Sequence, residues 1–268
     1  MANNSNLSKR AALRKQQELE EQRKRAKKMM VIGLSVVSVI ALAIVSVVFY
    51  QWWSRSQASQ ETPPNATQEA GITINSTGTK PEGTVPHVVA YEDYQCPGCA
   101  AYEKSYGEAF LKLIDEGKIT FEVRTAHFLN DVNRNGNQKS SSRAAMAAAA
   151  ADQVGKYREY HAAVFKNQPQ EGVGYTDEQL TGDFAEQAGI TGEDLETFKK
   201  LYEQKTYEGF IERSNKAMGE AGVTSTPTYR VNGKDLKFVD PQTQKPLVTP
   251  NNPDSLMSAI QQTADSGS

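Results

Sequence analysis

Cys96 and Cys99 are the only two cysteines in the 268-residue chain, and two residues separate them. The hydrophobic residues 88–91 before them predict a buried strand, whereas the residues from Pro97 onwards favour a helix. Unpaired main-chain N–H groups and the positive end of the helix dipole stabilise a thiolate at a helix N-terminus. Cys96 is therefore the predicted nucleophile. Cys99, one turn further on, is placed to attack a mixed disulfide on Cys96.

Two other uses of this cysteine pair stay open from the residues alone. A Cys-x-x-Cys pair supplies half of a tetrahedral zinc site, but no second cysteine pair follows it. The remaining good zinc ligands, His87, His127 and His161, are scattered through unlike contexts, so the sequence predicts no metal site. A structural disulfide that staples the start of the helix is the second alternative, although so small a loop restricts the unfolded chain little.

A second motif occurs far downstream, in residues 222–234, where Thr226-Pro227-Thr228-Tyr229 leads into Val-Asn-Gly-Lys. Together with Tyr-Gln-Cys-Pro-Gly-Cys after a hydrophobic strand, this motif resembles the active site of the DsbA-like thioredoxin-fold family. The resemblance runs from about Ile72 to about Gln262. It implies an active-site loop made of Pro97, Gly98, Thr226 and Pro227, with a cis peptide bond before Pro227 that lies against the cysteines.

The resemblance also implies an activity and its partners. We expect a thiol-disulfide oxidoreductase that oxidises reduced or unfolded exported proteins through Cys96 and Cys99 without a bound cofactor. The expected reoxidant is a quinone-linked disulfide oxidase in the membrane. A reductase or isomerase of the same fold, and a tethered chaperone or binding module that needs no redox chemistry, remain as alternatives.

The sequence departs from the family pattern at two positions. Gly98 occupies the place where this family often has histidine, so no imidazolium is expected beside the Cys96 thiolate. Thioredoxin-like proteins commonly carry a buried acid six residues before the first cysteine, where this chain has Ala90. Glu92 shares the strand face of Ala90 by alternation. Our hypothesis is that Glu92 replaces the missing acid as the proton carrier for Cys99.

The N-terminal region predicts a bacterial membrane protein that crosses the membrane once. Residues 1–28 contain nine Lys or Arg and three Glu, and the following 22 residues, 29–50, carry no charge. An apolar run of about 20 residues spans a bilayer, and a basic flank marks the cytoplasmic side. We therefore predict a cytoplasmic segment 1–28 and a transmembrane anchor 29–53. A cleaved signal peptide ending at Ser56-Gln57-Ala58 is the competing interpretation, but the apolar run is long for it.

Residues 54–70 are rich in Ser, Gln, Thr, Asn and Pro, which predicts a flexible linker to an extracytoplasmic domain 71–268. The chain after residue 28 contains 21 basic and 29 acidic residues, a net charge of −8. Such an acidic domain is poorly suited to bind nucleic acid. Two cysteines in one motif also exclude a fold that depends on several disulfides.

The expected domain is an α/β thioredoxin-like fold with an all-helical insertion at about 140–220. Strands are predicted at residues 72–74, 88–91, 119–124 and 236–239, with helical patterns between them. Ser141 and Ser142 are the predicted N-cap of the first inserted helix, and Thr176 and Thr191 cap later ones. His161 lies in an amphipathic helical pattern typical of a packed or hydrogen-bonded histidine, and we assign it no chemistry.

Overall fold

The computed structural model describes residues 29, 41–50, 53, 61–79, 81–132 and 136–266. The chain divides into two units, Met1–Ser56 and Gln57–Ser268. In the first unit the described residues are helical and exposed. The predicted cytoplasmic segment and residues 30–40, 51 and 52 of the predicted anchor lie outside the described residues. Within the described part of the chain, no helix has both the length and the apolar character that crossing a membrane requires.

The second unit is built on one mixed sheet of five strands in the order β1-β3-β2-β4-β5. These strands are β1 (Ile72–Ile74), β2 (His87–Glu92), β3 (Thr120–Thr125), β4 (Thr228–Val231) and β5 (Lys234–Asp235). The central strands β2 and β3 are parallel, because helix α2 (Pro97–Asp115) connects them as a crossover. All other neighbouring strands in the sheet are antiparallel. The predicted strand-helix-strand unit around the cysteines is confirmed.

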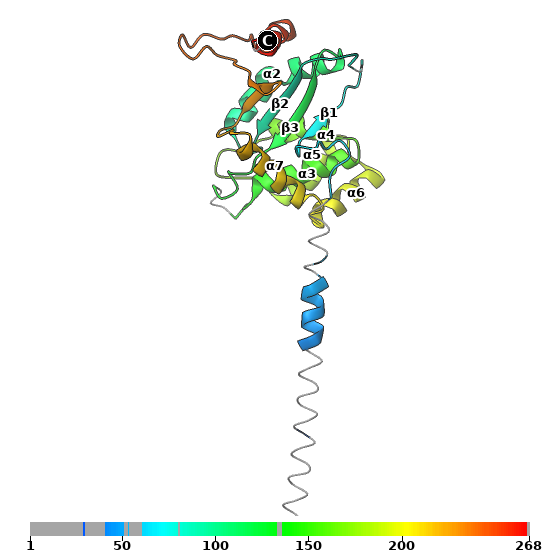
Figure 1. Ribbon diagram of the computed structural model, residues 1–268. Helices are drawn as coiled ribbons and strands as arrows, with labels where there is room; N and C mark the ends of the chain where they lie inside the picture. The colour runs from blue at the N-terminus through cyan, green and yellow to red at the C-terminus, as the bar shows by residue number, and fades with distance from the viewer. Residues whose placement is uncertain are drawn as a thin grey trace, which may run out of the picture. The chain divides into compact units, whose positions relative to one another are not determined.

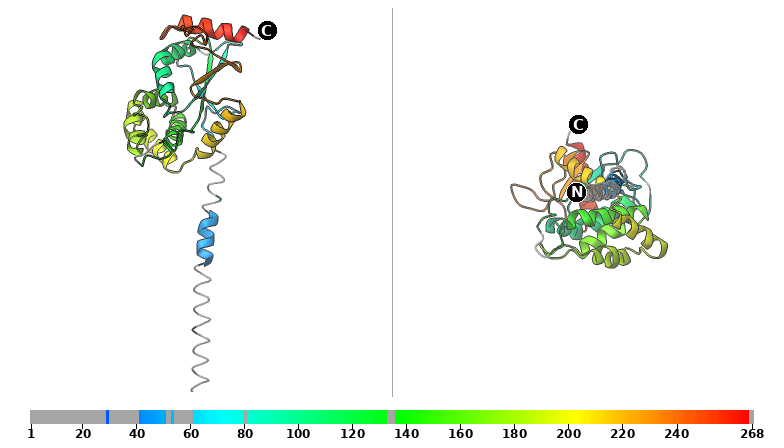
Figure 2. Two further views of the ribbon diagram at one scale, coloured as in Figure 1. Left: turned by 90° about the vertical axis from the view of Figure 1, so that its left-hand side faces the viewer. Right: turned by 90° about the horizontal axis from the view of Figure 1, so that it is seen from below.

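Helices fill the chain between β3 and β4, as predicted for the insertion. They are α3 (Ser140–Gln153), α4 (Tyr157–Lys166), the π-helix η1 (Gln179–Asp183), α5 (Phe184–Gln187), α6 (Gly192–Glu203) and α7 (Glu208–Glu220). A last helix, α8 (Pro253–Asp265), closes the described chain. The inserted helices gather at one end of the domain, and α8, in red, lies at the other (Figures 1 and 2). Helix α2, which begins directly after Cys96, packs against α4 of the insertion and against α8.

Alternation along β2 divides its side chains between two packed faces. Val88 and Ala90 belong to the main core, together with apolar side chains of α2. Val89 and Tyr91 belong to a smaller cluster that includes Met218 of α7. Both faces are covered, which explains why the strand reads as a continuous apolar run rather than as an alternating one. Because alternation continues to the end of the strand, Glu92 faces the same side as Ala90.

Two short polar motifs of the sequence form regular local structures, and the first of them is the predicted cap at Thr176. The side chains of Thr176 and Gln179 each accept from the other's main-chain N–H group, at 3.1 and 2.9 Å, in a capping box. Asn232 and Gly233 both have positive φ, and this conformation makes the two-residue hairpin turn between β4 and β5.

Three predictions about the fold are wrong in detail. Helix α3 begins at Ser140 rather than at Arg143, so its N-cap is Lys139 and both serines lie within its first turn. The predicted strand 236–239 is not part of the sheet, because β5 ends at Asp235 and the following residues pair instead with residues 246–248. Residues 61–70 of the predicted linker lie on the domain, where Asn65 donates from its main chain and its side chain to Asp152, both at 2.8 Å. Residues 54–60 of that linker lie outside the described residues.

Candidate active site

Cys96 occupies the N-cap position of α2 in an extended conformation, and Pro97 follows at the first helical position. Proline fits there because its fixed φ suits a helix and its missing N–H group has no helical partner to lose. The N–H group of Ala100 donates to the carbonyl of Cys96 at 3.2 Å and closes the first turn. This geometry directs the free N–H groups of the first turn towards the Cys96 sulfur.

The two thiols are both free, and they differ sharply in environment. Cys96 is half-buried, whereas Cys99 is completely inaccessible, at 0 % exposure. A hydrogen bond from the Cys99 thiol, the side chain of Thr226 and main-chain N–H groups together outweigh the effect of burial and lower the pKa of Cys96 to about 5. Burial, the same bond to Cys96 and the Glu92 charge raise the pKa of Cys99 far above its usual range. Cys96 therefore reacts as a thiolate, while Cys99 stays a thiol until Cys96 has reacted.

The loop before β4 lies directly opposite Cys96. The Cys96 thiol donates to the carbonyl oxygen of Thr226 at 3.4 Å. The Thr226–Pro227 bond is cis, as the family resemblance implied. A Cβ atom on Gly98 would lie 3.1 Å from Cδ of Pro227 and 3.6 Å from Sγ of Cys96. The two sequence motifs, 130 residues apart, are thus brought together into one surface.

The Thr226 hydroxyl is a further group that faces Cys96. It is buried, and it has no hydrogen-bond partner among the residues that the structure describes. Its proximity contributes to the low pKa of Cys96. Because a buried hydroxyl without a partner is unfavourable, donation to the Cys96 thiolate stabilises both groups.

Residues of the helical insertion hold the main chain just before Cys96. The amide of Gln168 donates to the carbonyl oxygens of Tyr94, at 2.8 Å, and of Cys96, at 3.0 Å. The hydroxyl of Tyr175 donates to the same carbonyl of Tyr94 at 2.7 Å. Sequence reasoning found neither residue, because both lie in the polar loop between two helical patterns.

Asp93 and Gln95 complete the support of this loop. The carboxylate of Asp93 accepts from the main-chain N–H groups of Gln95, at 2.9 Å, and Leu129, at 3.2 Å. The amide of Gln95 donates to the Leu129 carbonyl at 2.9 Å and to the Ser141 hydroxyl at 2.8 Å. Burial raises the pKa of Asp93 to about 6, although its hydrogen bonds oppose the shift. Ser141 therefore supports the loop of residues 93–96 between β2 and α2, which we call the redox loop, and it is not the predicted helix cap.

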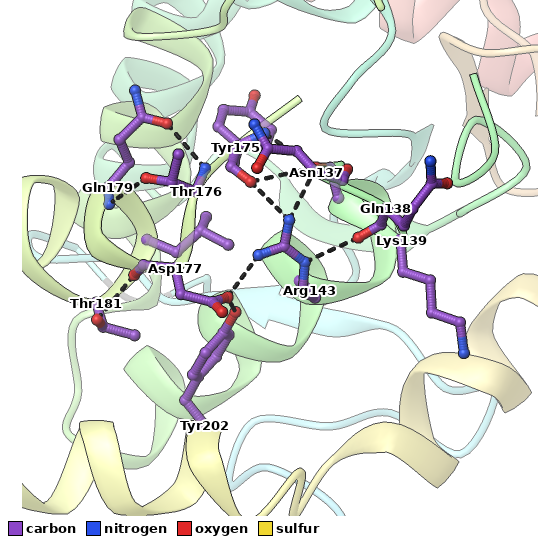
Figure 3. Close-up of polar contacts among 12 residues, drawn as sticks. Asn137, Gln138, Lys139, Arg143, Tyr175, Thr176, Asp177, Gln179, Thr181 and Tyr202 are labelled. Atoms are coloured by element: carbon purple, nitrogen blue, oxygen red, sulfur yellow. Dashed lines mark hydrogen bonds and ion pairs between the residues drawn. The ribbon is translucent and has the colours of Figure 1, made fainter. Parts of the chain in front are cut away.

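Figure 3 shows how the segment around Tyr175 is fixed. The guanidinium of Arg143 donates to the main-chain carbonyls of Tyr175, at 2.6 Å, and Gln138, at 3.0 Å, and it pairs with the carboxylate of Asp177. The hydroxyl of Tyr202 donates to the same carboxylate. These contacts tie the segment to the start of α3 and so set the position from which Tyr175 reaches the redox loop.

Glu92 lies behind Cys99 in the interior, at 1 % exposure. Its carboxylate accepts from the Tyr229 hydroxyl at 3.0 Å and lies 2.8 Å from Nε2 of His161. The negative charge of Glu92 contributes to the raised pKa of Cys99, which places it near that thiol. The structure thus brings together Cys96, Cys99, Gly98, Thr226, Pro227 and Glu92, and it adds His161, to which the sequence assigned no chemistry. Among the described residues, no group of three His, Cys, Asp or Glu side chains is arranged to hold a metal ion.

Comparisons with known proteins agree with this geometry. Residues 82–260 match a family model described as Thioredoxin. The reduced disulfide bond oxidoreductase DsbG of Mycobacterium tuberculosis is similar at 25 % identity and a TM-score of 0.55, over 75 % of this chain and 90 % of that one. Oxidised DsbA of the same organism is similar at 25 % identity and a TM-score of 0.54, over 73 % of this chain and 93 % of that one.

A third similar structure is MdbA, a thiol-disulfide oxidoreductase from Actinomyces oris, at 20 % identity and a TM-score of 0.57. The match covers 75 % of this chain and 90 % of that one, and it supports the fold. No curated protein sequence matches the chain. The family model covers most of the domain and includes both motifs of the site. The chain therefore belongs to the thioredoxin family, within which it is a DsbA-like thiol-disulfide oxidoreductase.

Proposed function

We propose that this protein forms disulfide bonds in exported or cell-envelope proteins through a redox pair made of Cys96 and Cys99. The observation that carries the proposal is the contrast between the two thiols. Cys96 is accessible and its pKa is lowered to about 5, whereas Cys99 is buried and its pKa is raised. A stabilised thiolate favours the reduced form of the pair, so the disulfide form is a strong acceptor of electrons.

The reaction begins with the oxidised pair. A substrate thiolate attacks Sγ of Cys96, the bond between the two cysteines breaks, and Cys99 leaves with the bonding electrons and takes up a proton. A second substrate thiolate then attacks the substrate sulfur of the mixed disulfide. Cys96 leaves as a thiolate, and its low pKa makes it a good leaving group. Two electrons pass from the substrate to the pair, and a membrane-bound, quinone-linked oxidase removes them.

Substrate binding is proposed to use the main chain beside Cys96. The Thr226 carbonyl faces the Cys96 sulfur, and the exposed edge of this loop suits an extended segment that pairs through main-chain groups. Such binding depends little on the side chains of the substrate. It fits an enzyme that acts on many unfolded chains.

The location of the enzyme follows from the N-terminal sequence. We assign residues 29–53 to a single membrane anchor with the basic segment in the cytoplasm and the redox domain outside, because the apolar run of 22 residues matches the thickness of a bilayer. Protease added to cells with a permeable envelope should remove the redox domain and spare the N-terminal segment. Protection of the domain would contradict this topology.

The activity is tested by incubating a reduced, unfolded protein of known disulfides with the oxidised full chain. We expect rapid disulfide formation by the wild type and none by Cys96→Ser. Cys99→Ser is first loaded with glutathione on Cys96; a substrate thiolate should then displace glutathione from the Cys96 sulfur, and the mixed disulfide should accumulate because Cys99 is absent. The reduction potential separates the alternatives. An oxidase should lie above about −180 mV, whereas a value near the roughly −270 mV of thioredoxin would identify a reductase. A variant in which both Cys96 and Cys99 are replaced by serine cannot oxidise substrates. If this variant still prevented aggregation of unfolded proteins as well as the wild type does, the chaperone or binding-module alternative would be favoured.

A further inference from the structure

His161 of α4 is a buried titratable side chain that the reaction above does not use. It is 3 % exposed, and both of its ring nitrogens face carboxyl groups. Nε2 lies 2.8 Å from Oε2 of Glu92, and Nδ1 lies 4.0 Å from Oε1 of Glu103. An imidazole between two carboxyl groups can accept a proton at one nitrogen and release one from the other.

Glu103 connects this buried cluster to the surface. Its side chain is 20 % exposed, unlike that of Glu92 at 2 %. The carboxyl group lies over Gly107, where a Cβ atom would come within 2.6 Å of Oε1. Only glycine at position 107 leaves room for this conformation, because even a methyl group would displace the carboxylate. The order of groups from interior to surface is thus Cys99, Glu92, His161, Glu103.

The remaining surroundings of His161 are aromatic. The rings of Tyr94, Tyr157 and Phe165 lie with centroids 5.7, 5.9 and 5.0 Å from the imidazole centroid. Burial raises the pKa values of Tyr94, Tyr157 and Tyr229 well above their usual value, so these phenols stay neutral between pH 5 and 8. The other ionisable groups around the imidazole are therefore the two glutamates, Glu92 and Glu103, and, beyond Glu92, Cys99.

We infer that His161 holds the proton that Cys99 takes up when its thiolate leaves, and that it passes this proton through Glu92 and exchanges it with solvent through Glu103. The inference rests on the proposed redox function and adds a route for its proton. His161 acts through Glu92, which makes it a positioning and proton-holding residue rather than one that touches the reacting sulfurs.

The proton balance of the step is simple. Before attack, His161 is an imidazolium bonded to the Glu92 carboxylate. When Cys99 leaves as a thiolate, Glu92 takes the proton from Nε2 of His161 and passes it to the Cys99 sulfur, so Glu92 ends as a carboxylate and His161 becomes neutral. The ring then changes tautomer so that its remaining proton lies on Nε2, and the vacated Nδ1 accepts a proton from the solvent side through Glu103. Reoxidation of the pair reverses each transfer.

The electrostatics favour this arrangement. A leaving Cys99 thiolate beside an unpaired Glu92 carboxylate would place two negative charges in one buried site. Although burial lowers the pKa of His161, the charge and hydrogen bond of Glu92 and the charge of Glu103 raise it overall. The imidazolium therefore persists to higher pH than that of an ordinary histidine and neutralises the site when the bond breaks.

The first test measures how fast glutathione opens the Cys96–Cys99 disulfide in the full chain as a function of pH, corrected for the ionised fraction of glutathione. The wild-type rate should fall as pH rises through the pKa of His161. His161→Gln keeps a donor to Glu92 but cannot titrate, so this inflection should be absent and the rate at low pH should drop by about 10²-fold, as for loss of a general acid. An inflection at the same pH in His161→Gln would overturn the inference.

Matched variants separate proton transfer from structure. Tyr229→Phe removes the other hydrogen bond to Glu92 and should keep the pH inflection. Glu92→Gln and the Glu92→Gln, His161→Gln double variant should be equally slow, because residues that act as one unit do not contribute additively. Additive losses would show that His161 has only a structural role.

A control step without Cys99 tests for damage to Cys96. In Cys99→Ser carrying glutathione on Cys96, attack on the glutathione sulfur releases the Cys96 thiolate. The rate of this release should be the same in Cys99→Ser and in the Cys99→Ser, His161→Gln double variant. The carboxyl group of Asp93 lies near Cys96 and has a pKa of about 6. Its titration should therefore affect this step equally in Cys99→Ser and in the Cys99→Ser, His161→Gln variant. A loss of rate here would contradict a role confined to Cys99.

The protonation of His161 is measured directly by nitrogen NMR, since the chain has only three histidines. Both ring nitrogens of His161 should carry protons at low pH, and the midpoint of their titration should lie above the ordinary histidine value of about 6.5 and coincide with the kinetic inflection. A midpoint at or below the ordinary value would overturn the inference. A reductase would use the same Cys99 step, so these results are independent of whether the protein proves to be an oxidase.

Discussion

The side-chain amide of Gln168 donates to the main-chain carbonyl of Cys96 at 3.0 Å across 72 residues of chain. The same nitrogen donates to the carbonyl of Tyr94 at 2.8 Å. These carbonyls belong to the loop between strand β2 and helix α2, whereas Gln168 follows the end of α4 in the insertion. The insertion therefore completes the redox loop of the core rather than merely covering it.

Replacing Gln168 by alanine should weaken this loop. The change removes two hydrogen bonds from partly buried carbonyls, so we expect a loss of about 1–3 kcal/mol in the free energy of unfolding. Because the carbonyl of Cys96 would be less restrained, alkylation of the Cys96 thiolate should also change in rate. Urea denaturation and timed alkylation of the reduced protein measure both effects.

Asn167→Ala is the matched control. This neighbouring amide also makes two hydrogen bonds, to the carbonyl of Ala163 and to Gln187, but none to the redox loop. It should lower stability while leaving the reactivity of Cys96 unchanged. Equal effects of the two variants on alkylation would refute a specific role for Gln168.

The hydroxyl of Thr226 should account for part of the low pKa of Cys96. Thr226→Val keeps the shape of the side chain and removes the donor, so the pKa of Cys96 should rise from about 5 by about one unit, the equivalent of roughly 1.4 kcal/mol. Thr226→Ser retains the hydroxyl and should keep the low value. Thiolate absorbance measured against pH distinguishes the two variants, and an unchanged midpoint in Thr226→Val would exclude the hydroxyl as a donor.

Gly98 offers a way to increase oxidising power. A Cβ atom at this position would lie 3.6 Å from Sγ of Cys96, so the imidazolium in Gly98→His should come near the thiolate and lower its pKa below about 5. The reduction potential should then rise. Gly98→Ala adds the same close contact with Pro227 without a charge, and it should not reproduce the change. A similar potential in both variants would point to packing rather than charge.

The stability of the reduced protein should depend on pH in a way that the oxidised protein does not share. Folding lowers the pKa of Cys96 from an ordinary value of 9.0 to about 5, so between these values the unfolded state binds more protons. The reduced form should therefore gain stability relative to the oxidised form as pH rises from 5 to 8, and lose it on acidification. Asp93 is present in both forms, and the Cys96 charge is the smallest of the causes that act on the pKa of Asp93, so most of its effect cancels in the difference.

Unfolding curves of both forms across this range measure the effect. A difference that stays flat with pH would mean that folding does not depress the pKa of Cys96. Above pH 9 the raised pKa of Cys99 acts in the opposite direction, so the comparison is confined to lower pH.

The sequence by itself determined those features that depend on local pattern. The apolar run before Cys96, the Cys-x-x-Cys spacing and the proline at the helix start fixed the strand, the helix and the position of the nucleophile. Alternation along β2 predicted that Glu92 would face inwards beside Ala90. Local patterning was misleading at residues 236–239, where an alternating apolar pattern is buried against the core without joining the sheet.

Only the tertiary structure decided which distant groups surround these residues. No motif marks the roles of Gln168 and Tyr175, and the helical pattern around His161 indicates only that it is packed, because these roles depend on where the insertion packs against the core. The depth of the pKa shift at Cys96 likewise depends on Thr226, whose contact with the sulfur spans 130 residues. Hydrogen bonds and charges act over a few ångströms in space, irrespective of separation along the chain, so no sequence pattern recorded these contacts.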